Sequence, residues 1–429
     1  MSYLLSLSRC ANKAFNLGLL TKAVFLLWVI AQLIIVLTLP DHFLQLPDAR
    51  NSYIPNSLWH WQHNTFYPTS HNLYDIYIQS LGYVNFLVLV LHSFGSFKAV
   101  MLINILMNIG VVACIYHIGS FFFNKNVGFY AVMLYCLLLS NTFVPIYIMS
   151  DLPSLFFSLL GFTLALRNKW YAVFLGGLLL GICHTIRPYE IAFVIALIVF
   201  FLMNKRKWVV YILLLLPYVS VIHAAGLYSE KQTKTYVTCS TTDGFGLLKI
   251  ALGDGKTDAG NGIVSDKADP HYIGIPDSLT FAQKDSLWKA KAMPGLKEKG
   301  FKYIINFPLR LLNILKFDTF FVPHPLRFFQ ADTPMEEIRN SSYHKLWKVG
   351  MVVNNIVYWI ILLLFVIAVF VMRNRILSES GIILLILVVM FCGFAVYIAE
   401  ERYHYPCISL MSIWAASMLS YENLLRVTK

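Results

Sequence analysis

Long, uncharged runs of apolar residues recur along the chain, separated by short polar segments. The first run follows Lys22 and reads AVFLLWVIAQLIIVLTLP. A helix needs about 20 such residues to cross the hydrocarbon of a bilayer, with a range of about 17–25. Runs near this length predict about ten transmembrane helices, at 23–40, 98–122, 127–147, 152–167, 170–186, 188–203, 208–227, 346–372, 380–399 and 404–421.

Composition supports an integral membrane protein and argues against a soluble one. Of the 429 residues, 58% are hydrophobic and 13% are charged, whereas soluble domains carry about 25% charged residues. The net charge of +12 does not indicate nucleic-acid binding, because many of the basic residues form short clusters between apolar runs. The seven cysteines are scattered without a Cys-x-x-Cys pair, so we expect neither a disulfide framework nor a cysteine metal site.

The segment 73–94 decides the predicted orientation, because it is apolar in part but interrupted by polar residues. If it lies along the membrane surface, the basic clusters at 167–169, 204–207 and 373–375 all face the cytoplasm. Both chain termini then lie there too, as the positive-inside rule favours. If it spans the membrane, those three clusters face outward. We therefore predict a surface position for 73–94.

This topology divides the chain into three predicted parts. Residues 1–227 form an N-terminal transmembrane module whose first outer loop, 41–97, carries juxtamembrane helices. Residues 228–345 form an extracytoplasmic loop domain with Gly-Asp and Asp-Pro turn signals between 253 and 271. Residues 346–429 form the C-terminal transmembrane helices.

The topology also places polar residues from distant segments at the outer interface. Polar residues beside apolar runs are candidates for function. An arginine can hold a phosphate through paired hydrogen bonds, and a carboxylate near a hydroxyl can act as a general base. The candidates are Asp41, Asp48, Asp151, Arg187, Glu190, Arg402 and His404.

Several segments, in their order and spacing, resemble one enzyme superfamily. They are PDARNSY after the first span, FYPTSHNLYDIYIQSLGYVNFLVLVLHSFGS, MSDLPSLFFSLLGFTLALRNK, GGLLLGICHTIRPYEIAFVIALIVFFL and ERYHYP. The chain resembles the GT-C glycosyltransferases, in particular dolichyl-phosphate-mannose protein mannosyltransferases and bacterial lipid A aminoarabinose transferases. The resemblance implies an all-α, GT-C-like bundle that uses a sugar on a polyprenyl phosphate.

The resemblance also implies roles for the two acidic candidates. Asp48 would be the catalytic base, because PDARNSY fits the family's Asp-then-Tyr pattern. Asp48 could instead only make an Asx turn after Pro47, and Asp41 is the alternative base. Asp151 would support the acceptor or the base. Alternatively, Asp151 or the residue before it caps the following helix.

The basic candidates match residues that hold the lipid phosphate in the family. Arg187 and Arg402 would take this role, with His404 as a further contact. Arg187 could instead snorkel to the headgroups, and Arg402 could pair with the neighbouring Glu400 or Glu401. His71 and Glu190 are further possible site residues.

The predicted function is therefore an inverting transfer of a sugar from a polyprenyl phosphate to an extracytoplasmic glycan, lipid or protein. The chain contains neither a Walker A loop nor a G-x-G-x-x-G motif after a strand, which gives no support for a nucleotide-linked donor. A divalent cation is possible but has no supporting residue pattern. The alternatives are a flippase for lipid-linked sugars and a glycan polymerase or ligase. The expected location is a bacterial inner membrane.

Overall fold

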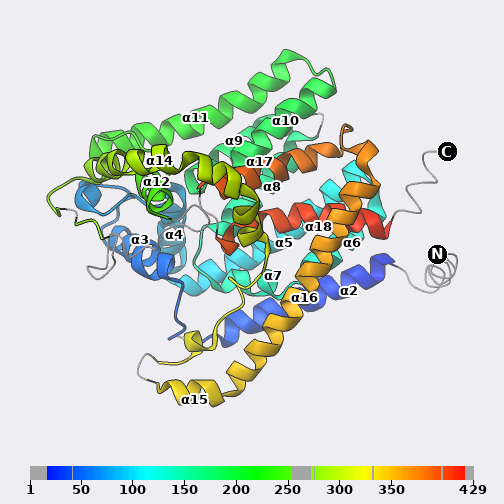
Figure 1. Ribbon diagram of the computed structural model, residues 1–429, viewed down its shortest axis with the longest axis horizontal. Helices are drawn as coiled ribbons and strands as arrows, with labels where there is room; N and C mark the ends of the chain where they lie inside the picture. Colours follow the sequence, from blue (N-terminus) through cyan, green and yellow to red (C-terminus); the bar gives the residue numbers. More distant parts are fainter. Residues whose placement is uncertain are drawn as a thin grey trace.

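The computed structural model describes residues 17–420, apart from 41, 168, 254–271, 275, 331–332 and 398–399. Every regular element in this part is a helix, which confirms the predicted all-α class (Figure 1). The α-helices are α2 Leu17–Thr38, α3 Ile54–Gln62, α4 Leu81–Phe94, α5 Phe97–Phe122, α6 Lys125–Leu137, α7 Leu139–Phe143, α8 Asp151–Ala165, α9 Trp170–Ile186, α10 Ile191–Met203, α11 Trp208–Thr233, α12 Asp243–Leu252, α14 Phe281–Leu315, α15 Met335–Asn340, α16 Ser342–Val371, α17 Gly381–Tyr397 and α18 Tyr405–Leu419.

All ten predicted spans fall on helices, but only some of these helices are long enough to cross a bilayer unaided. Among the described residues, α2, α5, α11 and α16 are long and apolar enough. The pair Lys125–Leu137 and Leu139–Ile146 is bent by 74° and gives a fifth candidate. The helices α8, α9, α10, α17 and α18 have 13–17 residues. The described part of the chain therefore has four or five candidate spans by length and composition, and the count of about ten stays a prediction.

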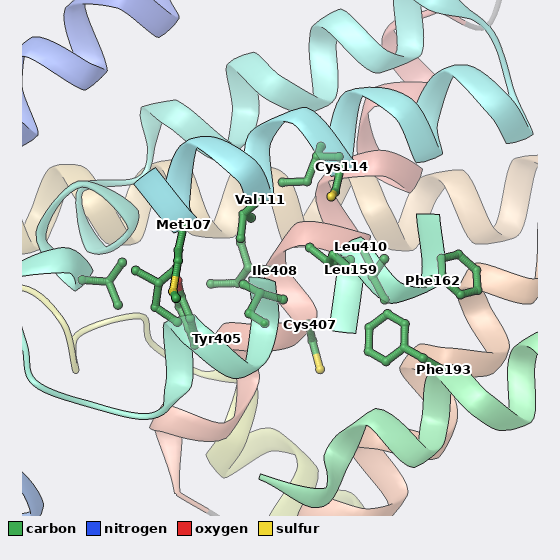
Figure 2. Close-up of a cluster of buried hydrophobic side chains, with 14 of the residues drawn as sticks. Met107, Val111, Cys114, Leu159, Phe162, Phe193, Tyr405, Cys407, Ile408 and Leu410 are labelled. Carbon is green, nitrogen blue, oxygen red and sulfur yellow. The ribbon is translucent and has the colours of Figure 1, made fainter. Parts of the chain in front are cut away.

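The centre of the molecule is built around α18. Its residues are buried from Tyr405 through Ser417, because α5, α6, α8 and α16 pack around it. Figure 2 shows Met107 and Val111 of α5 beside Ile408 of α18, with the aromatic rings of α8 and α10 close by. This packing fixes the residues that immediately precede α18, which matters for the site described below.

Small residues allow α9 to pack closely against both of its neighbours. A Cβ atom on Gly176 would lie 2.7 Å from the carbonyl oxygen of Gly161 in α8, and one on Gly177 would lie 2.1 Å from that of Leu214 in α11. Side-chain-free positions of this kind let helix backbones approach each other in membranes. The glycines therefore allow the backbone of α9 to lie close to those of α8 and α11.

We expect Gly177→Ala to lower the free energy of unfolding by about 1–3 kcal/mol, the usual range for overpacking, because the new methyl group meets backbone. Thermal unfolding in detergent measures this. Gly393→Ala in α17 is the matched control, since a Cβ atom there meets nothing within 4 Å. Equal unfolding temperatures for the two variants would contradict the close approach of α9 and α11.

The described part of the predicted loop domain, 228–345, is helical. α12 and α14 pack together around Leu248, Ala251, Trp288 and Ala292, and they lie with α3 toward the left of Figure 1. α11 passes through the predicted boundary at 227 and ends at Thr233. The turn signals between 254 and 271 lie outside the described residues.

The described part of the first outer loop contains the α-helices α3 and α4, and polar contacts join α3 to the segment between them. His60 of α3 lies 2.9 Å from the Thr65 hydroxyl and 3.0 Å from the Asn72 side-chain oxygen. Burial lowers the pKa of His60 to about 4, so its ring is neutral at physiological pH. Helices are present here as predicted, whereas their position relative to a membrane stays a prediction.

Candidate functional site

Four of the residues named from the sequence meet at one point of the fold. Asp48 directly precedes the turn Ala49–Tyr53, Asp151 begins α8, and Arg187 follows the last residue of α9. Arg402 lies in the turn Glu401–His404, immediately before α18. These segments are far apart in the sequence, so the tertiary fold brings them together.

Asp151 is the buried centre of this cluster. Its side chain is 2% exposed, and Arg402 pairs with both of its oxygens: Nε lies 3.1 Å from Oδ1 and Nη2 lies 2.8 Å from Oδ2. Arg187 Nη1 lies 3.3 Å from Asp151 Oδ1. A carboxylate this deeply buried is stable in its charged form only when it is paired, and here two guanidinium groups pair with it.

Arg402 connects this buried carboxylate to an accessible one. Its Nη1 donates to Asp48 Oδ2 at 2.5 Å, and the Asp48 side chain is 41% exposed whereas that of Arg402 is 7% exposed. Burial lowers the pKa of Arg402, but Asp151 and Asp48 outweigh this and raise it well above its usual value. The guanidinium therefore stays charged, and Asp48 is the member of the cluster that a substrate can reach.

Two hydroxyl groups that sequence reasoning missed hold Arg187 in place. Arg187 Nε donates to Ser150 Oγ at 2.7 Å, and the Tyr53 hydroxyl lies 3.1 Å from the same oxygen. Ser150 occupies the N-cap position of α8, but its side chain makes no capping bond. Its hydroxyl contacts Arg187 and Tyr53 instead. In the sequence, these two hydroxyl groups belong to the tyrosine of PDARNSY and to the residue just before Asp151, and these positions could have identified them.

His404 and Arg402 belong to different networks, although they share one turn. His404 is buried, with Nδ1 2.8 Å from the Ile314 carbonyl oxygen and Nε2 3.2 Å from Asp318 Oδ1. Asp318 also accepts from the Ser140 hydroxyl at 2.5 Å and from Asn354 at 3.2 Å. The predicted contact between His404 and a lipid phosphate thus has no support from its position beside Asp318.

Glu190 lies in a third polar group. It is fully buried, with Oε1 2.8 Å from His184 Nδ1 and accepting from the Tyr218 hydroxyl at 2.9 Å. His71 stacks on Trp59 with ring centroids 4.0 Å apart, in the first outer loop. The structure does not bring either residue into contact with the four-residue cluster. Asp41 lies outside the described residues.

The glutamates next to Arg402 have other partners. Glu400 pairs with Lys249 at 3.1 Å, and Glu401 accepts from the Thr319 hydroxyl at 2.7 Å. Arg402 instead pairs with Asp48 and Asp151. Within the described part of the chain, no group of three or more His, Cys, Asp or Glu residues could hold a metal ion, so a divalent cation stays a prediction.

Comparisons with known proteins assign no family. No family model and no curated protein matches the chain. Two solved structures of the Archaeoglobus fulgidus oligosaccharyltransferase are similar in shape. One, tethered to an acceptor peptide with the NVT sequon, has 13% identity and a TM-score of 0.48, over 94% of this chain and 49% of that one. The other, with zinc and sulfate, has 12% identity and a TM-score of 0.39, over 79% and 40%.

The chain thus spans about half the length of the oligosaccharyltransferase. Likeness at these scores is too weak to carry a function.

Proposed function

We propose that this protein is a membrane glycosyltransferase that moves a sugar from a polyprenyl phosphate to an extracytoplasmic acceptor. The observation that carries this proposal is the cluster itself. Asp48, Asp151, Arg187 and Arg402 come from four separate segments, and they form one ion network with a half-exposed carboxylate at its edge. An apolar helical bundle around such a network suits a donor whose tail lies in lipid.

The carboxylate of Asp48 and the guanidinium groups of Arg187 and Arg402 would have different roles in the reaction. The acceptor oxygen attacks the anomeric carbon, a C–O bond forms, and Asp48 takes the hydroxyl proton as general base. The bond between the anomeric carbon and the phosphate oxygen breaks, and its electron pair leaves with the phosphate. Arg187 and Arg402 would stabilise the charge that develops on this group. A single displacement of this kind inverts the anomeric centre.

The observed pairing suggests how the donor could prepare the base. In the structure, Arg402 Nη1 is occupied by Asp48, while its Nε and Nη2 are held by Asp151. A donor phosphate would compete with Asp48 for Nη1, since a phosphate oxygen is an equally good acceptor for a guanidinium. Release from Arg402 would leave the Asp48 carboxylate free to accept a proton. Asp151 would meanwhile keep both arginines in place.

The arrangement of α8 and α9 supports an outward-facing site. α8 begins at Asp151 and ends beside Arg167, and α9 begins beside Lys169 and ends at Arg187. The cluster and the basic turn 167–169 therefore lie at opposite ends of both helices. Because basic turns favour the cytoplasmic side, the cluster would face outward, toward a cell-envelope glycan, lipid or protein as acceptor.

Mass spectrometry of lipid-linked sugars and envelope glycans tests this function. Cells that lack the gene would carry the wild-type copy, Asp48→Asn, or Asp277→Asn as an exposed control, at matched expression. We expect Asp48→Asn to lose one sugar from a glycan while the polyprenyl-phosphate sugar persists, because removing a general base typically slows a reaction by about 10²–10⁴-fold. Asp277→Asn should restore the wild-type pattern.

The other outcomes separate the alternatives. Wild-type glycans in the Asp48→Asn cells would show that Asp48 is not the base, and Asp41 would be tested next. Loss of glycan length with an intact repeating unit would indicate a polymerase or ligase. A lipid-linked sugar confined to the cytoplasmic leaflet of the mutant would indicate a flippase.

A further inference from the structure

A second candidate site lies at the far ends of α8–α11 from the ion cluster. It is a cavity of about 420 Å³ between the turn that joins α8 to α9 and the turn that joins α10 to α11. α9 has 17 residues, so at 1.5 Å per residue the cavity lies roughly 25 Å from Arg187. It is therefore separate from the proposed transfer site, and the inference that follows does not depend on the proposed function.

The cavity concentrates positive charge. Four basic residues line it, namely Arg167, Lys169, Arg206 and Lys207, and none of its twelve lining residues is acidic. Like charges gathered in this way repel one another, and an anion bound among them would reduce the repulsion. This composition indicates a ligand with at least one negative charge.

The N-terminal ends of two helices add to the positive potential of the cavity. α9 and α11 both begin at the cavity, with Lys169 and Lys207 at their N-cap positions. Neither lysine side chain caps its helix. Helix N-termini carry a partial positive charge and unsatisfied N–H groups, which favour anions. The two helix ends thus reinforce the four basic side chains.

The rest of the cavity wall is apolar, so together with the basic residues it indicates an amphiphilic ligand. Val173, Phe201 and Leu213 line the cavity beneath the basic residues. Trp170, which lines the cavity, is 70% exposed, and Trp208, between the lining residues Lys207 and Val209, is 71% exposed, as is typical of side chains at the level of lipid headgroups. Exposed apolar residues continue along the same two helices, such as Phe174 and Leu216. These residues form an apolar surface against which acyl chains can lie.

We propose that this cavity binds the phosphate headgroup of an anionic phospholipid, whose acyl chains lie against α9 and α11. Basic pockets between transmembrane helices bind anionic headgroups in this way. A soluble phosphate would gain from the charges but not from the apolar wall and the exposed tryptophans. An anionic phospholipid would match both the basic residues and the apolar wall of the cavity.

Native mass spectrometry of the full chain in neutral detergent tests the proposal. Phosphatidylglycerol is the probe, and phosphatidylcholine with the same acyl chains is the zwitterionic comparison. We expect wild-type protein to retain phosphatidylglycerol preferentially. Lys169→Gln combined with Lys207→Gln should weaken this binding by roughly tenfold or more, since each basic residue near a lipid surface contributes appreciably.

A matched control removes the same charge elsewhere. Lys205→Gln combined with Arg373→Gln changes two exposed basic residues that do not line the cavity, and it should bind phosphatidylglycerol as wild type does. Equal losses in both double variants would overturn the proposal, because binding would then be a general effect of charge. Unchanged binding in the Lys169/Lys207 variant would also overturn it.

Two further measurements locate the ligand and identify its class. Val210→Phe fills the cavity without changing its charge, and we expect it to weaken phosphatidylglycerol binding as well. Undiminished binding in this variant would place the lipid outside the cavity and overturn the proposal. Inorganic phosphate should displace phosphatidylglycerol only in large excess. Displacement at a concentration equal to that of the lipid would show a site for soluble anions instead.

Discussion

Arg402→Gln is expected to lower the free energy of unfolding by about 3–5 kcal/mol, the range for breaking a buried ion pair by removing one partner. Asp151 is 2% exposed and loses both of its hydrogen bonds from Arg402, while it keeps the contact with Arg187. Since whole proteins are stable by about 5–15 kcal/mol, this loss is a large share of the total. The proposed transfer should fail in the same variant.

Thermal unfolding in detergent measures the effect, and a double-mutant cycle assigns it to the pair. Asp151→Asn and the double variant complete the cycle, and the effects of the two single changes should not add, because each removes the same paired contact. Asp48→Asn is the control within the cluster, because its side chain is 41% exposed and should contribute little to folding. If Arg402→Gln unfolds at the same temperature as Asp48→Asn, the buried pairing is absent.

Arg402→Lys separates charge from geometry. Lysine keeps a positive charge, but it cannot bond to both oxygens of Asp151 and to Asp48 through a planar fork. We expect this variant to retain more stability than Arg402→Gln while still losing transfer. Full transfer activity in Arg402→Lys would show that the forked geometry is not needed.

Asp318→Ala is the second change with a large expected effect, a loss of about 3–5 kcal/mol in the free energy of unfolding. Asp318 is 1% exposed and accepts from Ser140, Asn354 and His404. Removing the carboxylate leaves buried donors without an acceptor, at about 1–3 kcal/mol for each group. These donors come from α7, α16 and the turn before α18, so three elements lose a shared hydrogen-bond acceptor.

Unfolding in detergent again gives the measurement, with Asp277→Ala as an exposed acidic control. Asp318→Asn should lose less stability than Asp318→Ala, because an amide oxygen can still accept from Ser140 or Asn354. A variant Asp318→Ala as stable as the control would show that this network does not form. Because His404 precedes α18 directly, we also expect Asp318→Ala to disturb Arg402 in the same turn.

The sequence was sufficient to choose the members of the ion cluster, but not to predict how they pair. Asp48, Asp151, Arg187 and Arg402 each lie near the beginning or the end of an apolar run, and the predicted topology places such positions at one interface. Which carboxylate each arginine meets depends on packing around α18, which no local pattern encodes. Arg402 pairs with Asp48 and Asp151, hundreds of residues away, and not with Glu400 or Glu401, the alternative partners that the sequence offered.

Local backbone geometry explains the predicted residues that lie elsewhere. Arg402 and His404 share a 3₁₀ turn, where three residues complete one rotation, so side chains two positions apart point in different directions. Arg187 has an extended backbone, whereas Glu190 lies in the following 3₁₀ turn, and they too point into different networks. Asp318 was not predicted, because a single acidic residue between aromatic ones has no periodic signature.

The order of the cluster along the chain has a consequence for biosynthesis. The hairpin α8–α9 carries Asp151 at its first residue and Arg187 just after its last, so this acidic residue enters the membrane with its own counter-ion. Arg402, which joins the two carboxylates, is synthesised much later, just before α18. A polypeptide released before Arg402 lacks the residue that connects Asp48 to Asp151. The cluster therefore forms only after synthesis has passed Arg402, long after the α8–α9 hairpin is complete.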